Sequence, residues 1–192
     1  AVSVWDRNRE GAEETAEMIR EAGNNAVAIG CDSSVASEIA AAIARTRAEL
    51  GPVTILVNNA ALSPFCAFEE LSEAAWDALM AINLKGPFLC CQAVIPDMVA
   101  AGWGRIVNIS SSSAQTGAPA MAHYAASKGG VVGMTLPIAR DLARSGIRVC
   151  TIAPGIFLTP MLHSLPKEVQ DSLGAQVPFP SRLGQPSEYA AL

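Results

Sequence analysis

Short apolar runs that alternate with longer segments of helical composition constrain the fold of this chain more than any other feature. The run Val53–Val57 is continuous and apolar, as expected for a strand that is buried on both faces. Helices are predicted between such runs, for example from Asn8 to Ala22 and from Val35 to Leu50. This alternation predicts a single α/β domain with a doubly wound parallel sheet of the Rossmann type. The predicted strands are Val2–Asp6, Ala26–Cys31, Val53–Val57, Ile106–Ile109 and Ile147–Ala153.

Capping residues and helix breakers set the predicted helix bounds. Ser33 and Ser34 are candidate N-caps for the second helix. Ser72 is the predicted N-cap of a long helix that runs to about Ala101. Gly86-Pro87 lies inside that helix and should kink or divide it.

Composition argues against several classes of function. The formal net charge is −5 over 192 residues with no run of Lys or Arg, which argues against a nucleic acid partner and against an anionic membrane surface. The sequence contains no apolar run of about eighteen residues, so no membrane span is predicted from it. The five cysteines lack the spacing of metal ligands, and they are predicted to be reduced core residues of a cytoplasmic protein. The two histidines give no metal site either.

Polar residues follow the predicted strands, at the edge where parallel sheets of this kind bind ligands. Five such positions lie at or just past the end of a predicted strand: Asp6, Asp32, Asn58-Asn59, Ser111 and Pro154-Gly155. Because the carboxyl ends of parallel strands meet at one edge, all five should converge on one crevice.

Asp6 ends the first predicted strand, where nucleotide-binding α/β domains place a carboxylate on the adenosine ribose hydroxyls. This carboxylate would repel a 2′-phosphate and therefore favours NAD. The neighbouring Arg7 could instead attract that phosphate, which leaves NADP open. Asp6 could also be a helix N-cap. Asp32 could similarly accept a hydrogen bond from an adenine amine or only cap its own helix.

Tyr124 and Lys128 are four residues apart in a predicted helix, so a phenol and an ammonium group lie on one face. A nearby lysine charge lowers the pKa of a phenol towards the range where it exchanges a proton with an alcohol or a ketone. Ser111 lies thirteen residues before Tyr124 and could hold the substrate oxygen. Asn83, in an apolar stretch, either makes a structural bond to the adjacent strand or forms part of a water relay that leads to Lys128.

These residues together resemble the short-chain dehydrogenase/reductase family across essentially the whole chain. The resemblance rests on Asn58-Asn-Ala, Asn83, Ser111, Tyr124-x-x-x-Lys128 and Pro154-Gly-x-x-x-Thr159, in this order and at these intervals. It implies that Tyr124 is the catalytic acid/base and that Lys128 lowers its pKa and binds the nicotinamide ribose. It also implies that Ser111 orients the substrate oxygen and that Asn83 holds a proton-relay water.

The same resemblance implies the cofactor contacts. Asn59 and Ala60 would line the adenosine side, with Asp6, Asp32 and Ser33, while Phe157 and Thr159 would contact the nicotinamide carboxamide. Hydride would pass between nicotinamide C4 and the carbonyl carbon of a small-molecule substrate.

Two positions depart from the family pattern. The family's Asn-Asn-Ala-Gly is Asn58-Asn-Ala-Ala61 here, so an extra methyl group lies where the backbone approaches the cofactor, and a mild perturbation is expected. The usual Asp-Val is Asp32-Ser33, which keeps the carboxylate and changes the contact on the adenine side.

The resemblance also gives an expectation about domain organisation. Residues 1–192 are expected to form a single nucleotide-binding oxidoreductase domain that lacks the family's first strand with its Gly-rich loop and its last strand. Without that strand and loop, the chain by itself is expected to bind NAD poorly and to show no measurable activity.

Within the family, two groups share segments with this chain. The part from Gly133 onward is similar to short-chain (type 10) 3-hydroxyacyl-CoA dehydrogenases, and Val53–Gly130 is similar to 3-oxoacyl-[acyl-carrier-protein] reductases. Both imply a 3-hydroxyacyl or 3-oxoacyl thioester substrate. The alternatives are a dehydrogenase of an alicyclic, steroid or sugar alcohol and, in another class, a non-catalytic nucleotide-binding protein or inactive fragment. Relatives are commonly tetramers built through helices that correspond to Glu73–Ala101 and Ala122–Arg144, so a homo-oligomer is expected.

Overall fold

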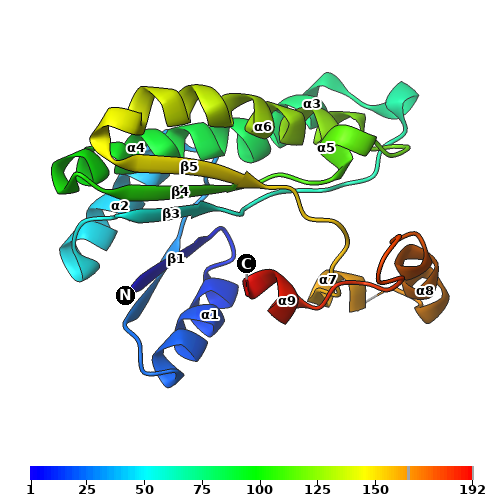
Figure 1. The fold of residues 1–192 in the computed structure, drawn as a ribbon, viewed down its shortest axis with the longest axis horizontal. Helices are drawn as coiled ribbons and strands as arrows, with labels where there is room; N and C mark the ends of the chain where they lie inside the picture. Colours follow the sequence, from blue (N-terminus) through cyan, green and yellow to red (C-terminus); the bar gives the residue numbers. More distant parts are fainter. Residues whose placement is uncertain (164, 192) are drawn as a thin grey trace. The chain divides into compact units, whose positions relative to one another are not determined.

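The structure, a computed structural model, describes residues 1–163 and 165–191. The chain divides into two compact units, Ala1–Ile152 and Ala153–Leu192. The strands that the structure describes all belong to the first unit, together with the helices that cover them (Figure 1).

Two parallel sheets form the centre of the first unit. One contains β1 (Val2–Asp6) and β2 (Ala26–Gly30), and the other contains β3 (Ile55–Asn58), β4 (Gly104–Ile109) and β5 (Ile147–Ile152), in that order. The predicted strands are therefore confirmed within one to two residues at each end, and every pairing is parallel. In the described part of the chain no ladder joins β1 to β3, which agrees with the expectation of a doubly wound sheet that lacks the family's first strand.

Helices cover both faces of the β1–β2 sheet. Alanines of α1 (Arg9–Glu21) pack on Ala28 of β2, while α2 (Ala36–Leu50) packs on the opposite face of the same strand. Small side chains bring α1 close to the sheet, because alanine occupies the positions that face it. Helices on two faces of a parallel sheet are the arrangement expected of a doubly wound fold.

The start of α2 corrects one prediction. Its N-cap is Val35, which makes no capping bond through its side chain, so neither Ser33 nor Ser34 caps the helix. Instead the Ser34 backbone N–H and hydroxyl both donate to Asp32 Oδ1, at 2.8 and 2.6 Å. The Asp32 carboxylate forms a local turn and takes the serine away from the helix end.

The long helix is divided, as predicted, but by a π-helical segment. Ser72 caps α3 (Glu73–Met80) through a bond from the Ala75 N–H to its hydroxyl at 3.2 Å. The π-helical segment Ala81–Lys85 follows, and α4 (Gly86–Ala101) continues from it. Such segments are rare, and they often lie at functional sites.

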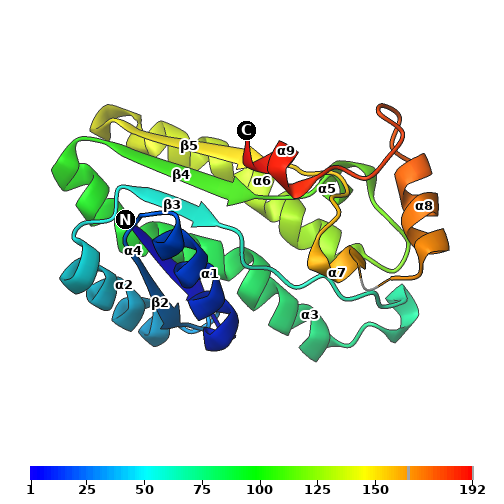
Figure 2. The same cartoon turned by 90° about the horizontal axis from the view of Figure 1, so that it is seen from below.

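Helices α4 and α6 (Ala122–Leu142) pack on one face of the three-stranded sheet, and α2 lies beside α4 (Figures 1 and 2). Side chains of α4, β4 and β5 form the main core there, including Met98, Ile106 and Ile147. A Cβ atom on Gly104 would lie 2.6 Å from the Met98 sulfur, so glycine permits this close packing.

The opposite face of β3 corrects another prediction. Ile55 and Val57 are 57% and 56% exposed, so β3 is not buried on both faces as its apolar run predicted. Successive strand residues point to opposite faces, and only Leu56 between them packs against the core.

One helical stretch is long and apolar enough to cross a membrane by length and composition alone. It is Glu73–Ala101, with a mean hydropathy of 1.5 in its most apolar window. Helices in the core of a folded domain meet the same criteria, and this stretch packs against β3, β4 and α6. The feature is therefore weak evidence for a membrane partner.

The second unit contains three helices in its described residues: α7 (Pro160–His163), α8 (Lys167–Ala175) and α9 (Pro186–Ala190). Pro166 is the N-cap of α8, and Pro186 is the first residue of α9. A parallel bridge joins Phe157 to Gly184 in this unit.

Candidate active site

The carboxyl end of β4 is joined to α6 at Lys128. The Lys128 Nζ donates to the Ile109 carbonyl oxygen at 2.7 Å, and the Ser110 hydroxyl donates to the Lys128 carbonyl oxygen at 2.9 Å. The Ser110 N–H also donates to Ile152 of β5 at 2.8 Å. Because Ser111 follows directly, these bonds fix the strand end that carries it against the helix that carries Lys128.

Lys128 and Tyr124 lie one turn apart on α6, as predicted. The Lys128 Nζ is 5.9 Å from the centroid of the Tyr124 ring. Lys128 is 3% exposed, whereas Tyr124 is half-buried and can be reached from solvent. Burial lowers the pKa of Lys128 to about 8, because a desolvated ammonium is disfavoured. With a pKa of about 8, Lys128 can gain or lose its proton when its surroundings change slightly.

Ser111 begins the turn into α5 (Ser113–Thr116). Its Oγ accepts a bond from the Ser113 N–H at 3.2 Å. This bond uses a lone pair of the Ser111 hydroxyl and leaves its proton available for donation. A half-buried hydroxyl held in this way suits the orientation of a substrate oxygen.

Asn83 is fully buried in the π-helical segment, and protein groups occupy its side chain. Oδ1 accepts from the Leu62 N–H at 2.8 Å, while Nδ2 donates to the Leu62 carbonyl oxygen at 2.8 Å and to Ser127 Oγ at 3.2 Å. Ser127 in turn donates to the Tyr124 carbonyl oxygen at 2.8 Å. The structural interpretation of the Asn83 side chain therefore holds, although its partner is the loop after β3 rather than a strand. The water relay stays a prediction.

Asp6 and Asp32 lie at the carboxyl end of the β1–β2 sheet. Asp6 is exposed and accepts from the Asn8 N–H at 2.7 Å. Asn8 is the residue that caps α1, so the N-cap interpretation of Asp6 is wrong. Bonds from the Ser34 hydroxyl and N–H lower the pKa of Asp32, and the nearby Arg7 charge lowers it further. Arg7 lies near Asp32, and the binding of a ligand by the two carboxylates stays a prediction.

Ser33 lies against the first residue of α4. A Cβ atom on Gly86 would be 3.0 Å from the Ser33 carbonyl oxygen and 3.2 Å from its hydroxyl oxygen. Glycine at this position therefore lets the loop after β2 approach α4 closely. In the described residues no hydrogen bond joins Asp6, Asp32 or Ser33 to Ser111 or Lys128, and their convergence on one crevice stays a prediction.

Asn59 and Ala60 lie in the exposed segment that follows β3. Asn58 before them is anchored, because its Nδ2 donates to Asn108 Oδ1 at 2.8 Å. Ala61 has no left-handed backbone conformation; among the described residues other than glycine, only Ala120 has one. The extra methyl group of Ala61 therefore adds no backbone strain, which agrees with the mild perturbation expected for it.

Three polar residues near the site were missed from the sequence. Asn108 in β4 and Ser110 just after it are buried and follow Ile106 at every second position, so they face the helices with it. Ser127 is fully buried one residue before Lys128. The signal that could have found the first two is the change from apolar to polar side chains on one face of a core strand.

Phe157 and Thr159 belong to the second unit. Phe157 is half-buried and Thr159 is exposed. Their predicted contact with the nicotinamide stays a prediction.

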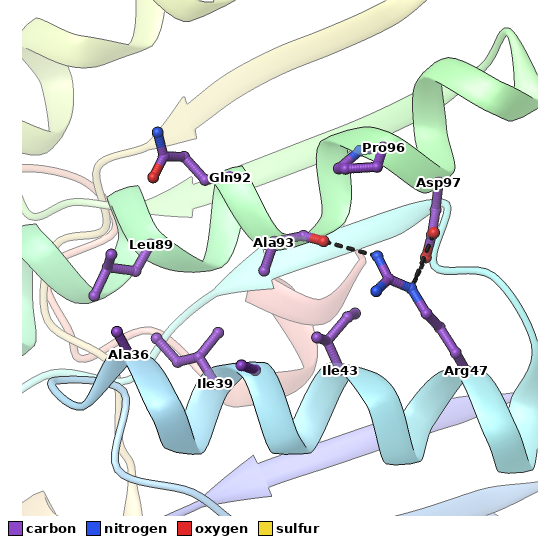
Figure 3. A pocket seen from close by; sticks show the side chains of 10 residues that line it. Ala36, Ile39, Ile43, Arg47, Leu89, Gln92, Ala93, Pro96 and Asp97 are labelled. Carbon is purple, nitrogen blue, oxygen red and sulfur yellow. Dashed lines mark hydrogen bonds and ion pairs between the residues drawn. The ribbon is translucent and has the colours of Figure 1, made fainter.

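A pocket of about 580 Å³ lies elsewhere, between α2 and α4 (Figure 3). At one end the Arg47 guanidinium bonds the Asp97 carboxylate at 2.9 and 3.0 Å and the Ala93 carbonyl oxygen at 2.9 Å. Asp97 also accepts from the Val53 N–H at 3.0 Å. None of the predicted site residues lines this pocket, so it is separate from the candidate active site.

Comparison with known proteins agrees with this geometry. Residues 1–170 match the short chain dehydrogenase family. Human 3-hydroxyacyl-CoA dehydrogenase type-2 is 41% identical over 201 residues, covering 98% of this chain and 76% of that protein. The 3-oxoacyl-[acyl-carrier-protein] reductase FabG of Staphylococcus aureus is 35% identical over 183 residues, covering 95% of this chain and 74% of that protein. A gluconate 5-dehydrogenase from Burkholderia cenocepacia, solved in complex with NADP and tartrate, has a TM-score of 0.86 and 36% identity over 96% of this chain and 73% of that chain.

The chain therefore belongs to the short-chain dehydrogenase/reductase family. The predicted α/β fold is confirmed, and so is the prediction of an oxidoreductase that depends on NAD(P).

Proposed function

We propose that this chain is the catalytic part of an oxidoreductase that interconverts 3-hydroxyacyl and 3-oxoacyl thioesters. The observation that carries the proposal is the attachment of the β4 end, and hence of Ser111, to the helix that bears Tyr124 and Lys128. Two of the relatives, from Homo sapiens and Staphylococcus aureus, are named for 3-hydroxyacyl-CoA and 3-oxoacyl substrates, which supports the thioester as substrate class.

Each of the three residues has a distinct role in this proposal. Tyr124 gives a proton to the substrate oxygen in reduction and takes one in oxidation. The Lys128 ammonium stabilises the phenolate that remains, since an opposite charge favours the ionised form of a neighbouring group. Ser111 donates its hydroxyl proton to the same substrate oxygen and fixes its position. A bound nicotinamide cofactor supplies the hydride chemistry.

The residues present fit such a cofactor at two places. Lys128 commits one hydrogen of its ammonium group to Ile109 and keeps two for further acceptors, such as ribose hydroxyls. Asp6 offers an exposed carboxylate at the end of β1, where adenosine ribose hydroxyls bind in folds of this kind. We propose NAD as the preferred cofactor, because Asp6 would repel a 2′-phosphate. Arg7 and the NADP in the Burkholderia structure support the alternative.

A homo-oligomer in the cytoplasm completes the proposal. Phe88 of α4 is 44% exposed, and Leu136 of α6 is 62% exposed. Both belong to the helices through which oligomers of this family are expected to form. Light scattering of the wild type and of Leu136→Glu tests the interface, since a charge there should shift the mass towards the monomer. Among the described residues the cysteines form no disulfide, which supports a reducing compartment.

Steady-state kinetics test the substrate and the cofactor together. A purified form of the protein that includes the family's first strand and Gly-rich loop is assayed for oxidation of NADH and of NADPH with acetoacetyl-CoA, a 5-keto sugar acid or cyclohexanone as oxidant. The proposal predicts the highest kcat/KM for acetoacetyl-CoA with NADH. A higher kcat/KM for the sugar acid would favour the second candidate, a sugar alcohol dehydrogenase, which the likeness to the gluconate 5-dehydrogenase supports. Binding of NADH without turnover of any substrate would favour a non-catalytic nucleotide-binding protein.

A further inference from the structure

The residues around Gly184 hold the segment Ile156–Thr159 in the second unit. The Leu158 N–H donates to the Gly184 carbonyl oxygen at 2.8 Å, and the Gly184 N–H donates to the Ile156 carbonyl oxygen at 3.0 Å. These two bonds form the parallel bridge between Phe157 and Gly184. Thr159 extends the ordered part, because its N–H donates to the Phe157 carbonyl oxygen at 2.8 Å.

Phe157 is packed against both Gly184 and Tyr189. A Cβ atom on Gly184 would lie 2.6 Å from two carbon atoms of the Phe157 ring, closer than real contacts allow. The Phe157 and Tyr189 rings meet edge to face, with centroids 5.4 Å apart and an angle of 68° between their planes. The Phe157 ring therefore has neighbours that define its position.

Gly184 is required for space rather than for its backbone conformation. Its φ lies outside the left-handed region, which other residues adopt only with strain. An alanine could take the same φ, but its methyl group would displace the Phe157 ring. The Phe157 ring can therefore occupy its position only because residue 184 has no side chain.

A salt bridge braces the segment that contains Gly184. The Arg182 guanidinium donates to both carboxylate oxygens of Glu188, at 2.6 and 2.9 Å, and to the Leu183 carbonyl oxygen at 3.0 Å. Glu188 also accepts from the Gln185 N–H at 2.7 Å, within the capping box of α9. Paired, parallel bonds of this kind fix geometry as well as adding stability.

We propose that Gly184 and Tyr189 are positioning residues for the nicotinamide end of the cofactor. They fix the Phe157 ring and, through the backbone bridge, the conformation of Ile156–Thr159. This inference rests on the proposed function and on the family resemblance, which implies that Phe157 and Thr159 contact the nicotinamide carboxamide. Loss of either support would let the segment move and weaken cofactor binding, while the proton-transfer groups in the first unit stay unchanged.

Binding and kinetics of Gly184→Ala test the proposal. We expect the Kd and KM for NADH to rise about tenfold, while kcat at saturating NADH changes less than about threefold, because the lost interaction is one of binding. In the Phe157→Ala background the same substitution should change the Kd by less than about twofold, since the ring that it displaces is gone. A merely structural role would lower Tm but leave the Kd of the folded protein unchanged.

Variants of Tyr189 give an independent measurement if Gly184→Ala folds poorly. Tyr189→Phe keeps the ring and should keep the Kd, since in the described part of the chain the hydroxyl has no hydrogen-bond partner. Tyr189→Ala should raise it several-fold. An unchanged Kd for NADH in both Gly184→Ala and Tyr189→Ala would overturn the inference and leave the proposed function intact. All of these measurements use a form of the protein that includes the family's first strand and Gly-rich loop, and absence of NADH binding by that form would contradict the proposed function and this inference with it.

Discussion

Lys128→Met measures how much stability the chain gives up to keep a buried ammonium group beside Tyr124. Lys128 is 3% exposed, and burial lowers its pKa from 10.5 to about 8. This shift corresponds to about 3 kcal/mol that disfavours the protonated lysine in the folded state. Because the unfolded chain binds this proton more tightly, the cost is complete below about pH 8, shrinks as the pH rises, and is absent above 10.5.

The substitution also removes a hydrogen bond. The Ile109 carbonyl oxygen loses the Nζ donor, which costs about 1–3 kcal/mol at any pH if that oxygen stays dry. Methionine is similarly long and flexible, so packing should change little. The two effects partly cancel at pH 7, but only the first depends on pH. We therefore compare the free energy of unfolding of Lys128→Met minus that of the wild type at two pH values. This difference should be about 2 kcal/mol larger at pH 7 than at pH 10.

Urea unfolding followed by tryptophan fluorescence at both pH values measures this difference. Lys85→Met, at an exposed lysine in the adjoining π-helical segment, is the control for loss of one positive charge. The reasoning would be refuted if Lys128→Met differed from the wild type by the same free energy of unfolding at pH 7 and at pH 10. Turnover should be lost in Lys128→Met at either pH, because the group that stabilises the phenolate is gone.

Two further predictions concern the cofactor and the buried amide. Asp6→Ala should narrow the preference for NADH over NADPH, because it removes the charge that repels the 2′-phosphate; an unchanged ratio of kcat/KM values would exclude this role. Asn83→Ala should lower the free energy of unfolding by about 2–4 kcal/mol, because it leaves the Leu62 N–H and carbonyl without partners. Asn59→Ala, at an exposed site, should change it by less than about 0.5 kcal/mol, and a similar loss in both would contradict the structural interpretation of Asn83.

Local signals predicted much of this fold. Ser72 and Gly86 each mark an element end as expected, because capping and helix termination depend on nearby residues. The prediction that Ser33 or Ser34 caps α2 was wrong. Asp32, two residues before Ser34, accepts hydrogen bonds from the Ser34 N–H and hydroxyl instead. A serine N-cap of α2 and hydrogen bonds from Ser34 to Asp32 have similar local chemistry, and the sequence does not show which of the two forms.

Other features depend on residues far apart in the chain. The exposure of Ile55 and Val57 depends on what covers that face of the sheet, which a run of apolar letters does not specify. The partner of Asn83 is the backbone of Leu62, 21 residues earlier. The order of side chains does not show which backbone groups a distant side chain bonds. The sequence therefore could not decide between the structural role and the relay role of Asn83.

In the candidate site, too, some features depend on nearby residues and others on residues far apart in the chain. The spacing of Tyr124 and Lys128 follows from helix geometry and was predictable. The bonds that attach Lys128 to Ile109 and Ser110 were not, because they depend on how α6 packs against the end of β4.

Single-turnover kinetics of Tyr124→Phe with NADH and acetoacetyl-CoA test most directly whether this phenol transfers the proton, in a form of the protein that includes the family's first strand and Gly-rich loop. The substitution removes the hydroxyl and keeps the ring. The proposed mechanism predicts that the rate of NADH oxidation falls by at least about a hundredfold, while the Kd for NADH stays within about threefold of the wild type. A variant that binds NADH normally and retains most of the wild-type rate would contradict the assignment of Tyr124 as the catalytic acid.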